Sequence, residues 1–258
     1  MGYSEEYLRS LKRRSADSNA SHLLPYLKPG MSVLDFGCGP GAISVDLAAA
    51  IAPGELHGID MTESQIEMAR AAAAAGGHKN ATFRVGDVTE LPFEDGSFDV
   101  AHCHAVLMHV PDTSAVLAEV IRVLKPGGII SAREGISSDV IMFPPPQSPL
   151  ANALASVIQA NGGHPDMGKE LKHEFIRAGF ADIFASVTCV ALSSTDEIAA
   201  LHNTFRSDGG ARVAAAYVKF GLGTQEDVDR ELAYVDELNA HPGAFVAVPW
   251  GVAIARKP

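Results

Sequence analysis

One stretch near the N-terminal end most restricts how this chain can fold, the run from Val33 to Gly41. It begins with apolar residues that predict a buried strand, and it continues with glycine at every second position, at Gly37, Gly39 and Gly41. Residues 42–52 then carry apolar side chains at helical spacing. A strand, a glycine turn and a helix start form a mononucleotide-binding loop, where a Cβ would block the turn and the approach of a ligand.

The glycine spacing and the residue before the glycines argue against a dinucleotide ligand. The run reads G-x-G-x-G, whereas a dinucleotide fingerprint reads G-x-G-x-x-G. Asp35 lies two residues before the first glycine, and a carboxylate there repels a phosphate and suits a ligand with a cationic end. An ordinary strand–loop–helix connection and a decayed dinucleotide site are the alternatives.

The stretch resembles motif I of the class I S-adenosylmethionine-dependent methyltransferases. In that family the acid lies near the amino acid end of the cofactor, so the resemblance implies that Asp35 contacts the cofactor. It implies the same for the loop residues Gly37, Cys38 and Gly39. The fold that it implies is α/β: a Rossmann-like, seven-stranded, mostly parallel sheet in the order 3-2-1-4-5-7-6, with an antiparallel last strand and helical lid insertions.

A second strand is predicted over residues 55–60, and Asp60 at its end lies 25 residues beyond Asp35. This is close to the offset of about 20 residues at which an acid meets ribose hydroxyls in nucleotide-binding α/β folds. The family resemblance agrees, because there an acid binds the ribose and the next residue, here Met61, packs on the adenine. The alternative for Asp60 is a turn or a helix cap.

The helix after this strand has capping residues of its own. Thr62 and Gln65 form the S/T-x-x-Q pattern of a capping box, so the start of this helix does not require Asp60 as a cap. Gln65 is therefore expected as a box partner and is also a candidate cofactor contact.

A third strand, residues 81–85, is followed by Gly86, Asp87 and Val88. In the resembling family an Asp here accepts a hydrogen bond from the adenine amino group, and the next backbone N–H donates to a ring nitrogen. A side-chain acceptor beside a main-chain donor is what an adenine edge requires. A lone Gly-Asp pair would be only a turn.

Two further motifs narrow the resemblance. The run from Leu91 to Val100 reads L-P-F-x-D-x-S-F-D-V, and residues 124–128 read L-K-P-G-G. Both are similar to the UbiE-like branch, the methyltransferases of ubiquinone and menaquinone biosynthesis. The specific motifs cover residues 31–134.

The resemblance implies one domain over residues 1–258. Within it we expect an N-terminal helical cover at 1–30, a cofactor-binding core at 31–134, and lid or substrate insertions at 135–168 and 194–243. The cover is predicted to be helical in two pieces, the second ending at the Lys-Pro-Gly of residues 28–30. Arg14 in this cover is a candidate contact for the cofactor carboxylate, and a solvated basic helix face is the alternative.

Three histidines cluster around the predicted end of the fourth strand, His102, His104 and His109. Methyl transfer from a sulfonium is an in-line displacement, which needs a base only if the acceptor is protonated at working pH. His104 is the best placed, and we expect it as a cofactor contact and as the candidate catalytic residue. A buried structural histidine is the alternative.

Composition excludes some partners and compartments. The formal net charge is −11, which argues against nucleic acid as the main partner. Three cysteines, odd in number and far apart, suggest reduced thiols and a cytoplasmic location, and no Cys/His set has metal-site spacing. The sequence shows neither a signal peptide nor an apolar run long enough to span a membrane.

These observations together predict an S-adenosylmethionine-dependent methyltransferase that forms S-adenosylhomocysteine and binds no metal. Its expected acceptor is a small aromatic, quinone-like or secondary metabolite, and homodimerisation is left open. The alternatives are an NAD(P)-dependent oxidoreductase, or a non-methylating member of the fold that binds the cofactor as a cyclase or regulator.

Overall fold

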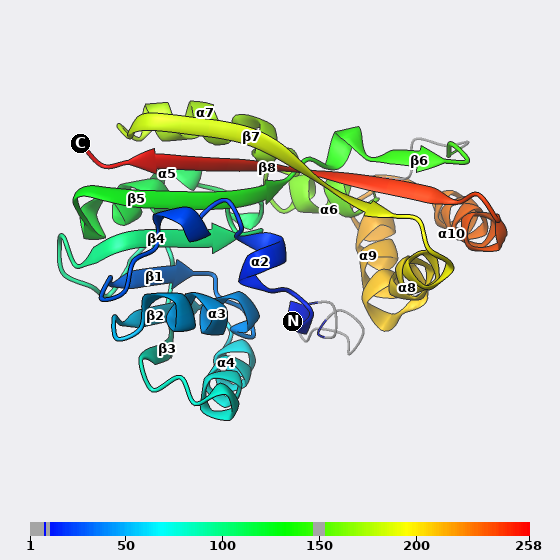
Figure 1. Cartoon of the computed structure of the whole chain (residues 1–258). Helices are drawn as coiled ribbons and strands as arrows, with labels where there is room; N and C mark the ends of the chain where they lie inside the picture. Colours follow the sequence, from blue (N-terminus) through cyan, green and yellow to red (C-terminus); the bar gives the residue numbers. More distant parts are fainter. Residues whose placement is uncertain (1–7, 9–10, 147–152) are drawn as a thin grey trace.

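The computed structural model describes residues 8, 11–146 and 153–258, and it is built on one mixed sheet (Figure 1). The strands are β1 (Val33–Phe36), β2 (Leu56–Asp60), β3 (Ala81–Val85), β4 (Phe98–His104), β5 (Leu124–Gly135), β6 (Ile141–Phe143), β7 (Ala181–Leu192) and β8 (Phe245–Arg256). The helices are α2 (Ala16–Asn19), η1 (Leu24–Tyr26), α3 (Ala42–Ile51), α4 (Glu63–Gly76), η2 (Leu107–His109), α5 (Thr113–Val123), η3 (Ser137–Asp139), α6 (Ala153–Ala160), α7 (Met167–Arg177), α8 (Thr195–Arg206), α9 (Asp208–Lys219) and α10 (Gln225–Ala240).

The strand order confirms the predicted α/β class. The main path runs β3-β2-β1-β4-β5-β8, with β7 on the other edge of β8. The first five strands pair in parallel, and β8 is antiparallel to both β5 and β7. The sheet has eight strands because the short β6 pairs with the outer end of β8, inside a segment predicted as a lid insertion.

Helices cover both faces of the sheet, which gives two main apolar cores. On one face α2, α3 and α4 bury a cluster that includes Leu23, Leu47 and Ile66. On the other face α5 and α7 bury a cluster that includes Leu117 and Phe175. A mostly parallel sheet requires this double cover, because its strands are apolar on both faces. No helix within the described residues has the length and apolar character needed to cross a membrane.

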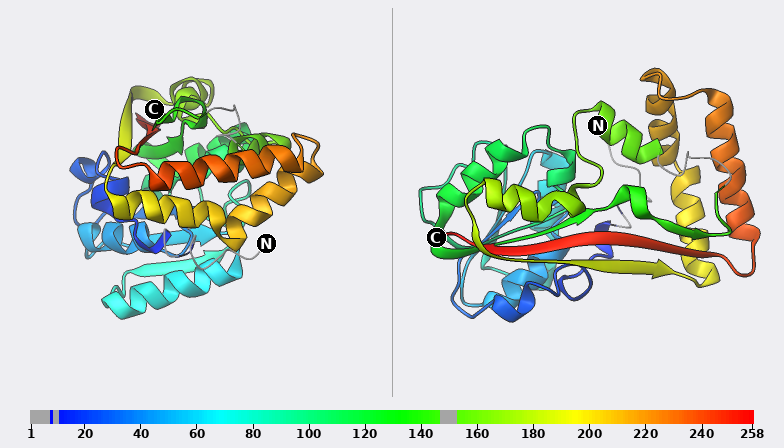
Figure 2. Two further views of the ribbon diagram at one scale, coloured as in Figure 1. Left: turned by 90° about the vertical axis from the view of Figure 1, so that its right-hand side faces the viewer. Right: turned by 90° about the horizontal axis from the view of Figure 1, so that it is seen from above.

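Strands β7 and β8 continue past the core as a long two-stranded arm, and helices α8, α9 and α10 gather at its outer end (Figures 1 and 2). These helices have small cores of their own, one around Tyr217 and Val228 and another around Ile198 and Leu238. The N-terminal segment with α2 lies between the main core and these helices (Figure 1).

The N-terminal cover is less helical than expected. Its described part holds helical residues at 8, 11 and 12, the four-residue α2 and the 3-10 turn η1. Pro25 stands in the first turn of η1 and has no N–H to extend a helix from the preceding residues, which accounts for the break. Residues 1–7, 9 and 10 of the predicted cover and 147–152 of the first predicted lid insertion lie outside the described residues.

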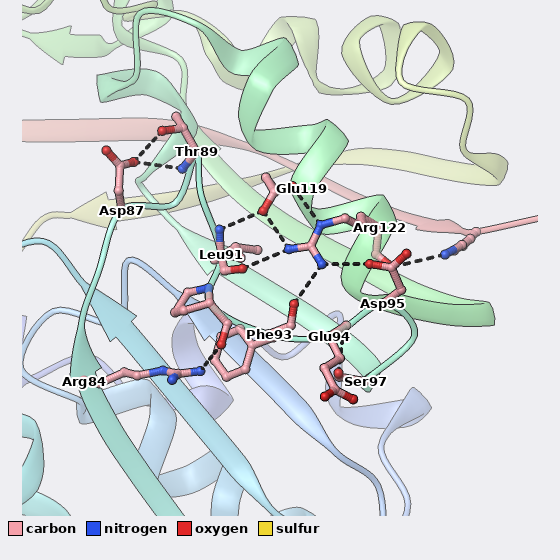
Figure 3. A network of polar contacts seen from close by, with 12 residues as sticks. Arg84, Asp87, Thr89, Leu91, Phe93, Glu94, Asp95, Ser97, Glu119 and Arg122 are labelled. Atoms are coloured by element: carbon pink, nitrogen blue, oxygen red, sulfur yellow. Dashed lines mark hydrogen bonds and ion pairs between the residues drawn. The ribbon is translucent and has the colours of Figure 1, made fainter.

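Arg122 makes most of the side-chain hydrogen bonds drawn to the loop between β3 and β4, the segment that carries Asp87, and Arg84 adds one to the Pro92 carbonyl (Figure 3). The Arg122 guanidinium donates to the carbonyls of Leu91 and Phe93 at 2.9 and 2.8 Å, and to the carboxylate of Glu119. Glu119 in turn accepts from the Leu91 N–H at 2.8 Å. Side chains of helix α5 therefore bind the backbone of the L-P-F motif.

We expect Arg122→Ala to lower the free energy of unfolding by about 2–3 kcal/mol, because several charge-assisted hydrogen bonds are lost at once. Urea unfolding followed by circular dichroism measures the change. Arg230→Ala is the control, since Arg230 is exposed on α10 and forms one ion pair among the described residues, with Asp227, so its loss should cost about 0.5 kcal/mol or less. Equal small losses for both variants would contradict the role assigned to Arg122.

Candidate functional site

The glycine loop after β1 is shaped for the close approach of a ligand. Gly37 and Gly39 have φ of +74° and +52°, a region that L side chains rarely adopt. A Cβ on Gly37 would collide with the side chain of Val106, so this glycine is needed for packing. A Cβ on Gly39 would meet only the Oε1 atom of Gln65, at 3.8 Å, so the backbone here faces open space.

Asp60 at the end of β2 is joined to this loop. Its Oδ2 accepts from the Gly39 N–H at 3.0 Å and its Oδ1 accepts from the Thr62 N–H at 3.0 Å. The predicted capping box is wrong, because the Thr62 side chain caps nothing and Gln65 does not reach back. Instead, both amide atoms of the buried Gln65 side chain lack a hydrogen-bond partner beside the loop.

Asp35 lies behind the loop, only 3% exposed, and Ser44 Oγ donates to its Oδ2 at 2.5 Å. The pKa of Asp35 is raised to about 7. Burial is the largest cause; the hydrogen bond from Ser44 lowers the pKa, and the charge of Asp60 raises it. A carboxylate held in this way gains from a nearby cation. The pKa of the Cys38 thiol is also raised, by burial and then by Asp35 and Asp60, so this thiol is not a nucleophile.

The ends of β2 and β3 form another part of the site. The Gly86 N–H donates to the Asp60 carbonyl at 3.0 Å, which joins the two strand ends. Asp87 follows and is exposed, and its Oδ1 accepts from the Thr89 N–H and hydroxyl, which hold its pKa below the usual range. Met61 beside it is 77% exposed. These groups present an acceptor and an apolar side chain on one edge.

Polar side chains converge on His104 at the end of β4. Arg133 Nη1 lies 2.7 Å and Asn19 Nδ2 3.1 Å from His104 Nε2, and Arg14 Nη1 lies 3.2 Å from Nδ1. The ring of Trp250 lies 5.0 Å from the imidazole, between centroids. Burial, and then Arg14 and Arg133, push the pKa of His104 well below 6.5, so the imidazole is neutral.

Glu134, near the end of β5, supports the loop that follows β4. It is fully buried, and it accepts from the backbone N–H groups of Val106, Leu107 and Met108 at 3.0, 3.0 and 3.2 Å. Burial raises its pKa to about 7. Glu134 thereby fixes the loop after β4, and Val106 of that loop packs against Gly37.

The predicted site residues thus fall into two neighbouring groups. The first surrounds the loop and the ends of β2 and β3, and it contains Asp35, Gly37, Cys38, Gly39, Asp60, Met61, Gln65, Asp87 and Val88. The second contains Arg14 and His104. His104 and Val106, two residues apart, connect the groups.

Sequence reasoning missed four residues of the second group and its support, namely Asn19, Arg133, Glu134 and Trp250. For Arg133 the implied strand order was a partial signal, because it places the fourth and fifth strands side by side. In the structure Arg133 pairs in register with His104, so both lie on one face of the sheet. Nothing in the sequence indicates that Asn19 and Trp250, from the two ends of the chain, join them.

Comparisons with known proteins agree with this arrangement. A family model described as a methyltransferase domain matches residues 27–175. The chain is 30% identical over 166 residues to an uncharacterised methyltransferase of Schizosaccharomyces pombe, covering 62% of this chain and 60% of that one. It is 43% identical over 100 residues to a demethylmenaquinone methyltransferase of Lactococcus lactis, covering 38% and 40%.

Among solved structures, the YcgJ protein of Bacillus subtilis is similar with a TM-score of 0.63 at 18% identity, over 92% of this chain and 97% of that one. The chain spans 50% to 63% of the length of the first curated relatives that it matches. The match over more than half of the chain and the sheet order lead to one conclusion: this chain belongs to the S-adenosylmethionine-dependent methyltransferases of class I fold.

Proposed function

We propose that this protein transfers the methyl group of S-adenosylmethionine to a small-molecule acceptor, leaving S-adenosylhomocysteine. The proposal rests on the glycine loop around Gly39, which lies between two acids. Asp35 is buried behind the loop, and Asp60 accepts a hydrogen bond from the Gly39 N–H. When bound, the cofactor supplies an electrophilic methyl group on a sulfonium. All other steps of the proposal are binding and orientation by this chain's own residues.

The acidic groups fit the two ends of such a cofactor. Burial disfavours the ionised form of Asp35 and raises its pKa in the ligand-free protein. The cationic amino acid end of the cofactor stabilises that ionised form. Asp60 accepts from ribose hydroxyls, and the partnerless amide of Gln65 gains a partner. Asp87 and the backbone of Val88 receive the adenine edge, with Met61 on the ring face; Gly37, Gly39 and Cys38 line the turn.

The acceptor side is assigned to the second group of residues. His104 is proposed as the side chain closest to the transferred methyl group, and Arg14 stays a candidate for the cofactor carboxylate. The insertions at 135–168 and 194–243 are proposed as the cover that excludes water and shapes the acceptor site, within a single domain. An aromatic, quinone-like or secondary metabolite is the expected acceptor class, supported by the partial similarity to demethylmenaquinone methyltransferases.

The remaining proposals concern partners and location. The net charge of −11 supports a small molecule over nucleic acid as substrate. Free cysteines support the cytoplasm. A homodimer is supported by strand β7, a sheet edge with exposed apolar side chains at Phe184, Val187 and Val190.

Calorimetric titration with S-adenosylmethionine, S-adenosylhomocysteine and NADH tests the cofactor. We expect micromolar binding of the first two and none of NADH, whereas binding of NADH alone would overturn the proposal. Incubation with a labelled methyl donor and a panel of small phenols, quinols and carboxylic acids then tests transfer. Tight cofactor binding without transfer to any acceptor would favour a cyclase or regulator on the same fold.

We expect Asp60→Ala to weaken binding of S-adenosylhomocysteine at least tenfold. Two hydrogen bonds from ribose hydroxyls to a carboxylate contribute about 1.5–3 kcal/mol each, and 1.4 kcal/mol corresponds to a factor of ten. Glu63→Ala is the control, because it removes the same charge three residues away on exposed α4. Unchanged affinity in a folded Asp60→Ala protein would remove Asp60 from the site.

We expect Asp35→Asn to stabilise the ligand-free protein, increasingly so as the pH rises. The folded-state pKa of about 7 lies above the ordinary value, so between pH 5 and 7 the unfolded chain has lost a proton that the folded protein retains. Wild-type stability therefore falls over this range, by about 1.4 kcal/mol per pH unit, and is then constant. Thermal unfolding at several pH values measures the difference between the two proteins.

The same variant should lose affinity for S-adenosylmethionine, because the neutral amide no longer attracts a cationic ligand. Asp196→Asn, which removes the same charge on the first turn of α8, is the control and should leave the affinity for S-adenosylmethionine unchanged. A stability difference between Asp35→Asn and the wild type that does not change with pH would contradict the raised pKa of Asp35.

A further inference from the structure

The contacts of His104 contain more hydrogen-bond donors than the imidazole can accept. The guanidinium groups of Arg133 and Arg14 can only donate, and they face Nε2 and Nδ1 respectively. Asn19 also donates to Nε2, because its own Oδ1 already accepts from Ser18 Oγ at 2.7 Å. A neutral imidazole has one lone pair to offer, so at least one of the two guanidiniums faces an N–H of the ring.

The shorter contact decides the tautomer. Arg133 lies 2.7 Å from Nε2 and Arg14 lies 3.2 Å from Nδ1, so Nε2 carries the lone pair and Nδ1 carries the proton. With this tautomer the ring presents Nδ1–H as a donor, beside the donors of the Arg133 guanidinium. A protonated imidazole would offer Arg133 no acceptor.

Arg133 adds a buried positive charge to the same place. It is 3% exposed, its guanidinium carbon lies 4.4 Å from the centre of the Trp250 ring, and its Nε donates to Thr188 Oγ1 at 3.4 Å. Across residues 8, 11–146 and 153–258, no carboxylate forms an ion pair with it. A buried cation normally has an anionic partner.

The position of this cluster separates it from the cofactor-binding loop. Arg133 lies on β5 and Trp250 on β8, whereas the loop and Asp60 lie on β1 and β2. Because β4 lies between β1 and β5, Arg133 is about 10 Å from the loop along the sheet edge, and His104 at the end of β4 lies between them. It lies on the side toward the β7–β8 arm and the helices that the arm carries (Figure 1).

We propose that Arg133 and His104 bind an anionic oxygen of the methyl acceptor, so that the acceptor is a phenol, an enol or a carboxylic acid bound in its ionised form. Assigning the anion to the acceptor rests on the proposed methyl transfer, in which the cofactor lies on the glycine loop and the ends of β2 and β3. Trp250, already stacked on both Arg133 and His104, supplies an aromatic surface beside the charge.

The test uses two probe anions and their neutral analogues with the full chain saturated in S-adenosylhomocysteine. The phenolate probe is 4-nitrophenol, whose ionised form absorbs visible light, and its neutral analogue is 4-nitroanisole. The carboxylate probe is benzoate, and its neutral analogue is benzamide. We expect one of the anions to bind at least tenfold more tightly than its analogue. Bound 4-nitrophenol should ionise at lower pH than the free probe, and the tighter of the two anions identifies the acceptor class.

Variants connect the binding to this cluster. Arg133→Gln should weaken binding of the preferred anion at least tenfold and leave the affinity for S-adenosylhomocysteine within twofold. Arg133→Lys keeps the charge in a fold-compatible side chain but loses the planar fork, so it should give an intermediate loss. Arg84→Gln is the control, since Arg84 also stacks on an aromatic ring, Phe93, but on β3 at the far side of the sheet.

Four results are informative. Anion binding that Arg133→Gln and Arg133→Lys leave unchanged, or that the neutral analogues equal, would overturn the proposal. Loss of S-adenosylhomocysteine affinity in these variants would assign the cluster to the cofactor carboxylate and also overturn it. No binding of either anion to the wild type at millimolar concentration would do the same. Arg133-dependent anion binding in a protein that does not bind S-adenosylhomocysteine would uphold the anion site and overturn the proposed methyl transfer.

Discussion

The hydrogen bond from the Gly39 N–H to the Asp60 carboxylate is the contact on which the rest of the site depends. It joins the loop after β1 to the end of β2, and the Gly86 N–H on the Asp60 carbonyl extends the connection to β3. Parallel strands end at one edge of a sheet, so three loops far apart in sequence meet there. Gly39 faces open space at that edge because its neighbours are held in place by the same bonds.

Charge is distributed unevenly along this edge. Carboxylates gather at the ends of β1 and β2, where buried Asp35 has its pKa raised to about 7 by loss of solvation. Arg133, on β5 two strands from β1, and Arg14 lie around a neutral His104 at the end of β4. The first region suits a cationic ligand and the second an anionic one. In the proposed reaction, these two regions bring a cationic methyl donor and an anionic acceptor to adjacent positions, as a displacement requires.

Residues without any contact to a reacting group hold this arrangement. Glu134 is buried beneath the loop after β4 and accepts three of its backbone N–H groups. Arg122, on α5, holds the loop that carries Asp87 (Figure 3). Both use a charged group to satisfy backbone atoms that would otherwise lose hydrogen bonds on burial. Loops that lack regular pairing need such support to keep a binding geometry.

Local pattern determined a large part of this protein. Apolar runs, the glycine turn and the acid at Asp60 depend on neighbours within a few residues, and the family resemblance rested on them. The resemblance in turn implied the strand order, and both were confirmed. The capping box at Thr62 and the second N-terminal helix were wrong, because Gln65 turns toward Gly39 and Pro25 ends the helix early. Only tertiary structure decided the cluster at His104. Asn19, Arg133 and Trp250 come from a helix, a central strand and the last strand, and strand pairing across the sheet and the packing of α2 bring them together.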